Sequence, residues 1–113
     1  SPRLYSRLIR ILYNSTLLSQ PSSEFALELM AQSEYHDALI AGIDSTNTIA
    51  HKFGEVGTRN DDGSITYQHH DCGIVYSENP YVICIMTEGS NLSTLAQTIA
   101  SLAHTTHAFM QKR

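Results

Sequence analysis

A lysine and a glycine lie in a stretch of strand-forming residues, 48–55. Its β-branched and aromatic residues favour a β-strand. Because side chains alternate between the two faces of a strand, Lys52 shares its face with Ala50 and Gly54, which are small. A cation above small residues can approach an anionic ligand closely, and Gly54 lets the backbone come near a bound group. The stretch therefore predicts an anion-binding lysine.

A lysine in a strand also has a structural explanation. Natural sheets often carry lysine on an edge strand, where the charge prevents pairing with another chain. The spacing of Lys52 alone does not separate this role from ligand binding.

Length and composition restrict the class of protein. The chain has 113 residues, enough for one domain with one modest core, and 42% hydrophobic and 16% charged residues indicate a globular fold. A formal net charge of −4 without a Lys/Arg cluster disfavours a nucleic-acid surface. No apolar run approaches the roughly 20 residues of a membrane span, and no signal peptide pattern occurs. Because the chain opens on Ser-Pro, we expect a processed protein or a piece of one.

Helical spacing of apolar residues predicts helices over 1–14, about 22–32 and about 92–110, and a turn of helix ending at Gly42. The apolar stripes expected to be buried are Leu4, Leu8, Ile11 and Leu12, widened by Tyr5 and Ile9, in the first helix, Phe25, Ala26, Leu29 and Met30 in the second, and Leu92, Leu95, Ala96, Ile99, Leu102, Ala103, Phe109 and Met110 in the last. His104 and His107 are expected on the polar face of the last helix.

Three strands are expected between the helices: the lysine strand, residues 65–76 and residues 81–87. Residues 58–64 form a loop whose Asp62-Gly63 pair is a hairpin signal, and a second turn precedes Tyr81. The third strand is apolar on both faces, which predicts a central, doubly covered strand. The fold class is therefore α+β, an antiparallel three-stranded meander flanked by helices, with an open sheet edge that predicts a missing neighbour.

Three sequence features together resemble a known family. Lys52-Phe53-Gly54 lies in the first strand, Ser1-Pro2-Arg3 opens a helix, and the segments 70–76 and 80–82 surround the second turn. This arrangement resembles the C-terminal half of class A β-lactamases and related penicillin-recognising serine hydrolases over nearly the whole chain. The resemblance implies that residues 1–113 are a single partial domain of a β-lactamase/transpeptidase-like α/β sandwich.

In that family a serine is acylated by a β-lactam or a peptidoglycan-like amide and then released by water. The resemblance implies that Lys52, Phe53 and Gly54 bind the substrate, with Lys52 attracting its carboxylate. It also implies that the backbone N–H of Glu55 belongs to the oxyanion hole, where it stabilises charge that develops in the transition state. No cofactor or metal is implied, and a periplasmic or secreted location is expected.

The sequence departs from the family pattern in two respects. Phe53 occupies the place of a hydroxyl residue that hydrogen-bonds the substrate carboxylate. The Ser-x-x-Lys nucleophile, the Ser-Asp-Asn element and the acidic deacylation loop do not occur. We therefore expect no turnover by this chain alone, and a partner that is a missing N-terminal half or a second copy. The alternative is a non-catalytic binding or interaction module that keeps the fold.

Histidines and cysteines elsewhere suggest zinc, but their spacing does not favour it. His69 and His70 point to opposite faces of a strand, so at most one of them can join His51. Polar pairing, with His70 or Asp71 supporting the lysine strand, is the preferred interpretation. Cys72 and Cys84 fall one residue out of register if Tyr76 faces Tyr81, so two small buried thiols are expected. Tyr67, Tyr76 and Tyr81 are expected to pack on the sheet.

Overall fold

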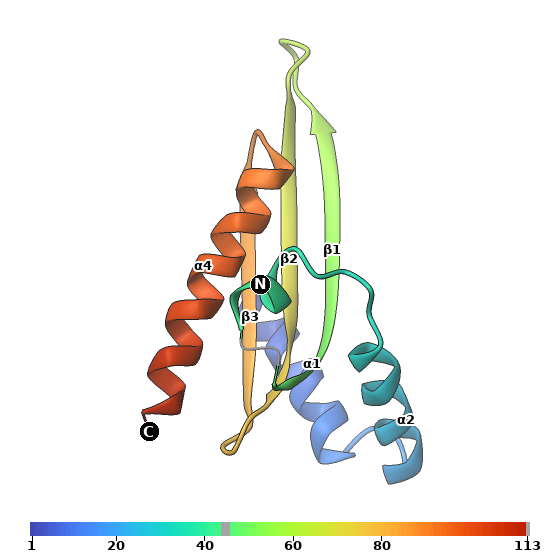
Figure 1. The fold of residues 1–113 in the computed structure, drawn as a ribbon. Helices are drawn as coiled ribbons and strands as arrows, with labels where there is room; N and C mark the ends of the chain where they lie inside the picture. The colour runs from blue at the N-terminus through green and yellow to red at the C-terminus, as the bar shows by residue number, and fades with distance from the viewer. Residues whose placement is uncertain (44–45, 113) are drawn as a thin grey trace.

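The computed structural model describes residues 1–43 and 46–112 (Figure 1). Along this part of the chain the elements are α1 (Pro2–Asn14), α2 (Gln20–Ala31), α3 (Leu39–Gly42), β1 (Thr48–Arg59), β2 (Ile65–Tyr76), β3 (Tyr81–Gly89) and α4 (Leu92–Gln111). The predicted α+β fold class is confirmed. None of these helices is long and apolar enough to span a membrane.

The strands form an antiparallel sheet in the order β1-β2-β3, with helices against both faces. On one face, side chains of the sheet pack against α3 and α4; the buried residues of this cluster are Ala38, Leu39, Ile43, Ile49, Val75, Tyr81, Ile83, Ile99 and Ala103. On the other face, Ala50, Cys72 and Ile74 pack against Ile9 of α1 and Leu27 of α2. The sheet is therefore a middle layer between two helical layers.

Side-chain caps determine where the helices begin. Ser1 accepts a hydrogen bond from the Leu4 N–H at 3.4 Å, and α1 ends at Asn14 as predicted. Ser19 accepts from the Ser22 N–H at 3.3 Å, with Pro21 in the first turn, so α2 begins at Gln20 rather than near Ser22. Asn91 accepts from the Thr94 N–H and caps α4.

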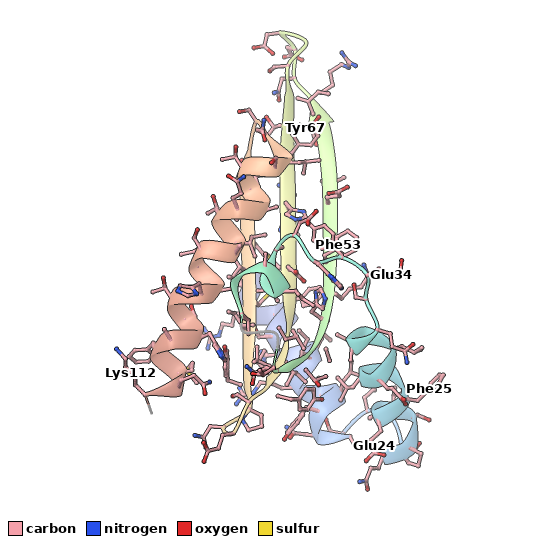
Figure 2. All side chains as sticks on the ribbon, viewed as in Figure 1. Glu24, Phe25, Glu34, Phe53, Tyr67 and Lys112 are labelled. Carbon is pink, nitrogen blue, oxygen red and sulfur yellow. A yellow bond between two sulfur atoms is a disulfide. The ribbon has the colours of Figure 1, made fainter. Side chains whose placement is uncertain are left out.

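The buried face of α2 was predicted only in part: Met30 packs against the core as expected, but two of the other predicted residues do not. Phe25 and Leu29 are 62% and 53% exposed, whereas Ser23 and Leu27 are buried. Figure 2 shows Phe25 projecting away from the sheet. The error has a physical reason: α2 carries apolar residues on more than one side, and its contacts with β1 and α1 select the buried one.

The outcome in α1 and α4 is also mixed. Leu4, Leu8, Leu102 and Phe109 are exposed, whereas the predicted residues Ile9, Leu95, Ala96, Ile99 and Ala103 are buried. His107 is also buried, not on the polar face as expected, because its Nδ1 shares a 2.7 Å hydrogen bond with the Tyr81 hydroxyl. Burial raises the pKa of Tyr81 above its ordinary value. The expectation that Tyr81 packs on the sheet is confirmed.

Two predictions about the strands need correction. Thr58 and Arg59 belong to β1, because they pair with Thr66 and Ile65 of β2, and the hairpin turn begins only at Asn60. In the described residues β3 pairs with β2 alone, so it is an edge strand and not a central one. Helices nevertheless cover both of its faces, as its apolar sequence predicted.

Cys72 and Cys84 form a disulfide, so the expectation of two free thiols was wrong. The reason is the strand register: Val75, not Tyr76, faces Tyr81, and Cys72 therefore lies directly opposite Cys84. The bond joins the middle strand to β3 on the face covered by α1.

We expect reduction of this disulfide to lower the free energy of unfolding by about 3 kcal/mol, because a cross-link restricts the unfolded chain. Urea unfolding followed by circular dichroism, with and without a thiol reductant, measures the change. The double variant Cys72→Ala/Cys84→Ala serves as control, since its midpoint must not respond to reductant. Equal midpoints for the oxidised and reduced protein would contradict the prediction.

Candidate functional site: the outer edge of β1

Lys52 lies on β1 and its side chain is exposed. Its Nζ donates a hydrogen bond to the main-chain oxygen of Phe53 and lies 4.8 Å from the centroid of the Phe53 ring. Phe53 belongs to the opposite face of the strand, so the ammonium reaches around the strand rather than standing above its own face. The positive charge is therefore positioned at the edge of β1.

The register of the sheet determines which backbone groups face this edge. The Thr87 hydroxyl donates to the His69 carbonyl oxygen at 2.7 Å, so the main-chain polar groups of His69 face β3. His69 pairs with Glu55, which makes this a non-hydrogen-bonded pair on the β1 side. The N–H of Glu55 therefore points away from β2. In the part of the chain that the structure describes, β1 pairs only with β2, so this N–H lies on an open edge.

Gly54 lies between these two groups and leaves the space above it clear. A Cβ placed on Gly54 would meet no atom within 4 Å. Its backbone is not in the left-handed region, where among the described glycines only Gly63 lies. Within the described residues, neither packing nor backbone conformation requires a glycine at position 54. Because Gly54 has no side chain, this part of the strand stays accessible.

Phe53 packs against the loop before α3. Its ring stacks on Tyr35, with 4.1 Å between the centroids and 27° between the planes. The side chain is partly buried and has no polar atom, so it cannot hydrogen-bond a carboxylate. Figure 2 shows Phe53 beside β1, near this loop.

A buried carboxylate supports the lysine strand from beneath. Asp71 Oδ1 accepts from His51 Nδ1 at 2.8 Å, and Oδ2 accepts from the Leu39 N–H at 3.1 Å. Asp71 is fully buried and His51 is 1% exposed. The prediction that Asp71 or His70 supports this strand is thus confirmed for Asp71. The described residues contain no group of three or more side chains arranged to hold a metal ion.

Tyr35 and His69 form a pair that was not predicted from the sequence. Tyr35 Oη and His69 Nε2 share a 2.7 Å hydrogen bond, and His69 Nδ1 lies 3.7 Å from Glu55 Oε2. Burial, followed by the negative charges of Asp37, Asp71 and Glu55, raises the pKa of the Tyr35 hydroxyl. Tyr35 and His69 are 34 residues apart, so no local spacing pattern could have joined them.

Lys52 is not among the residues that line the hollow next to β1. Glu55 lines this hollow, which lies between β1, the loop before α3 and the start of α4. The structure thus brings Lys52, Gly54 and the Glu55 N–H to one edge, with Phe53 turned to the α3 side.

We expect Asp71→Ala to lower the free energy of unfolding by about 2–5 kcal/mol, because it leaves the buried donors of His51 and Leu39 without an acceptor. Chemical unfolding measures the loss. Asp61→Ala is the matched control: this aspartate is exposed in the hairpin turn, and its loss should cost at most about 0.5 kcal/mol. Similar costs for the two variants would show that the buried carboxylate contributes little.

Comparison with known proteins bears on the whole of this chain. Residues 1–110 match the Beta-lactamase enzyme family. Comparison with curated protein sequences gives no match. Among solved structures, PBP-A is 25% identical with a TM-score of 0.84, and the match covers 100% of this chain and 40% of that one. A PBP-A mutant in an acyl-enzyme complex with penicillin G is 26% identical, with a TM-score of 0.82 and coverage of 100% and 40%.

A class A β-lactamase from Bacteroides cellulosilyticus DSM 14838 has the same fold, at 21% identity, a TM-score of 0.85 and coverage of 100% of this chain and 42% of that one. The chain thus spans about two fifths of the length of these structures. Together with the family match over residues 1–110, this confirms the resemblance, and the chain belongs to the β-lactamase enzyme family.

Proposed function

We propose that this chain supplies the strand side of a penicillin-recognising serine hydrolase site, in which the outer edge of β1 holds a β-lactam or peptidoglycan-like amide. The observation that carries the proposal is the convergence of the Lys52 ammonium and the outward Glu55 N–H on one open edge, separated by a glycine with clear space above it. An extended amide can bind such an edge through main-chain hydrogen bonds.

Each group has a distinct role. The Lys52 ammonium attracts the carboxylate of the substrate. Its positive charge beside the strand makes the electrostatic potential there favourable to anions. The Glu55 N–H donates to the carbonyl oxygen of the amide, and this hydrogen bond strengthens as the oxygen becomes an oxyanion during acyl transfer. The free space at Gly54 lets the substrate approach the backbone within hydrogen-bonding distance.

The acylated serine must come from outside this chain, because none of its serines is followed three residues later by lysine. We propose that the chain works as one part of a single larger domain. The missing N-terminal half of the same protein would supply the serine and the second wall beside Lys52, and an unpaired sheet edge would join the two parts. A PBP-A mutant has been solved as an acyl-enzyme complex with penicillin G, which supports the proposed reaction class.

A fluorescent penicillin should not label the 113-residue chain by itself, but should label a longer product of the same gene that contains Ser-x-x-Lys. In that product, Lys52→Ala should slow acylation about 10- to 100-fold, the effect of losing one charge-assisted hydrogen bond. Stopped-flow or gel fluorescence measures the rate.

Lys112→Ala is the control, since this lysine is at the C-terminal end of α4, far from Phe53 (Figure 2). Labelling of the 113-residue chain would overturn the assignment of the nucleophile. An unchanged rate in Lys52→Ala, with Lys112→Ala also unchanged, would remove Lys52 from the site.

Phe53 favours a second candidate function, a binding module that keeps the fold without catalysis. The stacked Phe53 and Tyr35 rings present an apolar surface where a hydroxyl would serve carboxylate recognition. Such a module would still hold an extended peptide along β1 through the same main-chain groups, without forming an acyl-enzyme.

The substitution Phe53→Thr separates the two functions. If the site is catalytic, the new hydroxyl should raise the rate of penicillin acylation about 5-fold in the longer gene product, because one hydrogen bond is worth about 1 kcal/mol. Phe25→Thr, an exposed phenylalanine on α2, controls for the general effect of losing an aromatic ring. A protein that stays folded and remains unlabelled in both variants would favour the binding module.

A further inference from the structure

A hollow of about 460 Å³ adjoins the proposed site on the other side of β1. Its walls come from three segments: the loop before α3 with Tyr35 and Asp37, β1 with Glu55, and the first turns of α4 with Ser93 and Gln97. Because its walls come from separate elements, the hollow is a product of tertiary packing. Lys52, which lies at the strand edge, does not line this hollow.

The hollow is acidic. Asp37 and Glu55 are exposed carboxylates in its wall, and none of its lining residues is a lysine, arginine or histidine. The N-terminal end of α4 opposes them, but a helix end is equivalent to only about half a positive charge, and the Asn91 side chain already caps it. Two full negative charges outweigh it. The pKa of the Tyr35 hydroxyl in the same wall is raised, first by burial and then by the charges of Asp37, Asp71 and Glu55.

A second observation comes from the side chain behind the wall. His69 is 1% exposed, and its Nδ1 has no hydrogen-bond partner. This atom faces the Glu55 carboxylate at 3.7 Å, beyond hydrogen-bonding distance, while Nε2 is bonded to Tyr35. Both ring nitrogens of His69 therefore face residues that line the hollow, and one of them is unsatisfied. Buried polar atoms without partners are rare and mark places where a ligand or water completes the structure.

Glu55 connects this hollow to the proposed site. Its main-chain N–H faces the open edge of β1, and its side chain enters the hollow. A ligand lying along the edge can therefore place its reacting amide at the Glu55 N–H and a second group in the hollow. These two places are about one residue apart. The Lys52 ammonium lies at the edge of β1, and the carboxylates lie in the hollow on its α3–α4 face, which suits a ligand carrying charges of both signs.

We infer that the hollow binds a cationic group of the substrate, a primary ammonium on a short alkyl chain. An ammonium has three donors, and the hollow offers the Asp37 and Glu55 carboxylates and the amide oxygen of Gln97 as acceptors. The inference rests on the proposed function for the identity of the ligand as a substrate. It narrows the substrate class to amides that carry an amine. Substrates bound only through their own carboxylate would lack the group that the hollow binds.

The test is a binding experiment that needs no acylation. The purified protein is titrated with Nα-acetyl-lysine methylamide and with its Nε-acetylated, neutral counterpart, and amide NMR shifts are recorded. We expect the charged peptide to bind at least 10-fold more tightly and to shift Glu55, Ser93 and Gln97. Glu55→Gln and Asp37→Asn should each weaken binding by about 10-fold, whereas Glu78→Gln, in an exposed turn, should not.

A variant that adds a positive charge to the hollow distinguishes an electrostatic loss of binding from a loss caused by misfolding. Gln97→Lys places an ammonium into the hollow from an exposed helix position, and it should abolish binding of the charged peptide while the thermal midpoint stays unchanged. Equal affinity for the charged and neutral peptides, or an equal loss in Glu78→Gln, would overturn the inference. Penicillin labelling reports separately on the proposed function, so a failure of either can be recognised.

Discussion

The carboxylate of Asp71 is the constraint on which the candidate site depends. It is fully buried, and each of its oxygens accepts one hydrogen bond, from His51 of β1 and from the N–H that begins α3. A buried charge without partners would cost several kcal/mol, so the chain must bring β1, β2 and α3 together to satisfy it. Because His51 directly precedes Lys52, its hydrogen bond to Asp71 also helps to position Lys52 along β1.

The register of the sheet extends this constraint to the backbone. Once Asp71 faces Phe53, His69 faces Glu55, and the polar main-chain groups of His69 turn toward β3. The backbone groups of Phe53 and Glu55 are then left facing outward, where the Lys52 ammonium already makes use of one of them. If β1 slipped by one residue against β2, the main-chain groups that now face outward would face β2. The N–H proposed for the oxyanion hole would then be lost from the edge. The disulfide between Cys72 and Cys84 ties the middle strand to β3 in this same register.

Charge is divided across β1. A single lysine lies at the edge, and two carboxylates lie in the hollow beside it, with a buried histidine and a tyrosine behind them. Phe53 stacks on Tyr35, which lines the hollow, so an aromatic pair lies beside both regions. Membership of the β-lactamase enzyme family accounts for the fold, and the side chains along β1 and the hollow determine this division of charge.

The sequence by itself determined the elements that depend on local chemistry. Ser1 and Asn91 cap their helices, Gly63 adopts the left-handed conformation in the β1–β2 hairpin, and apolar periodicity located α1 and α4. Lys52 and Asp71 could be selected because strand alternation is a local rule. Tertiary structure decided the rest. Which stripe of α2 is buried, which residue faces Cys84, and that Tyr35 meets His69 all depend on contacts between distant segments. Local spacing cannot specify them, because a periodic pattern indicates that a face will be buried but not what will cover it.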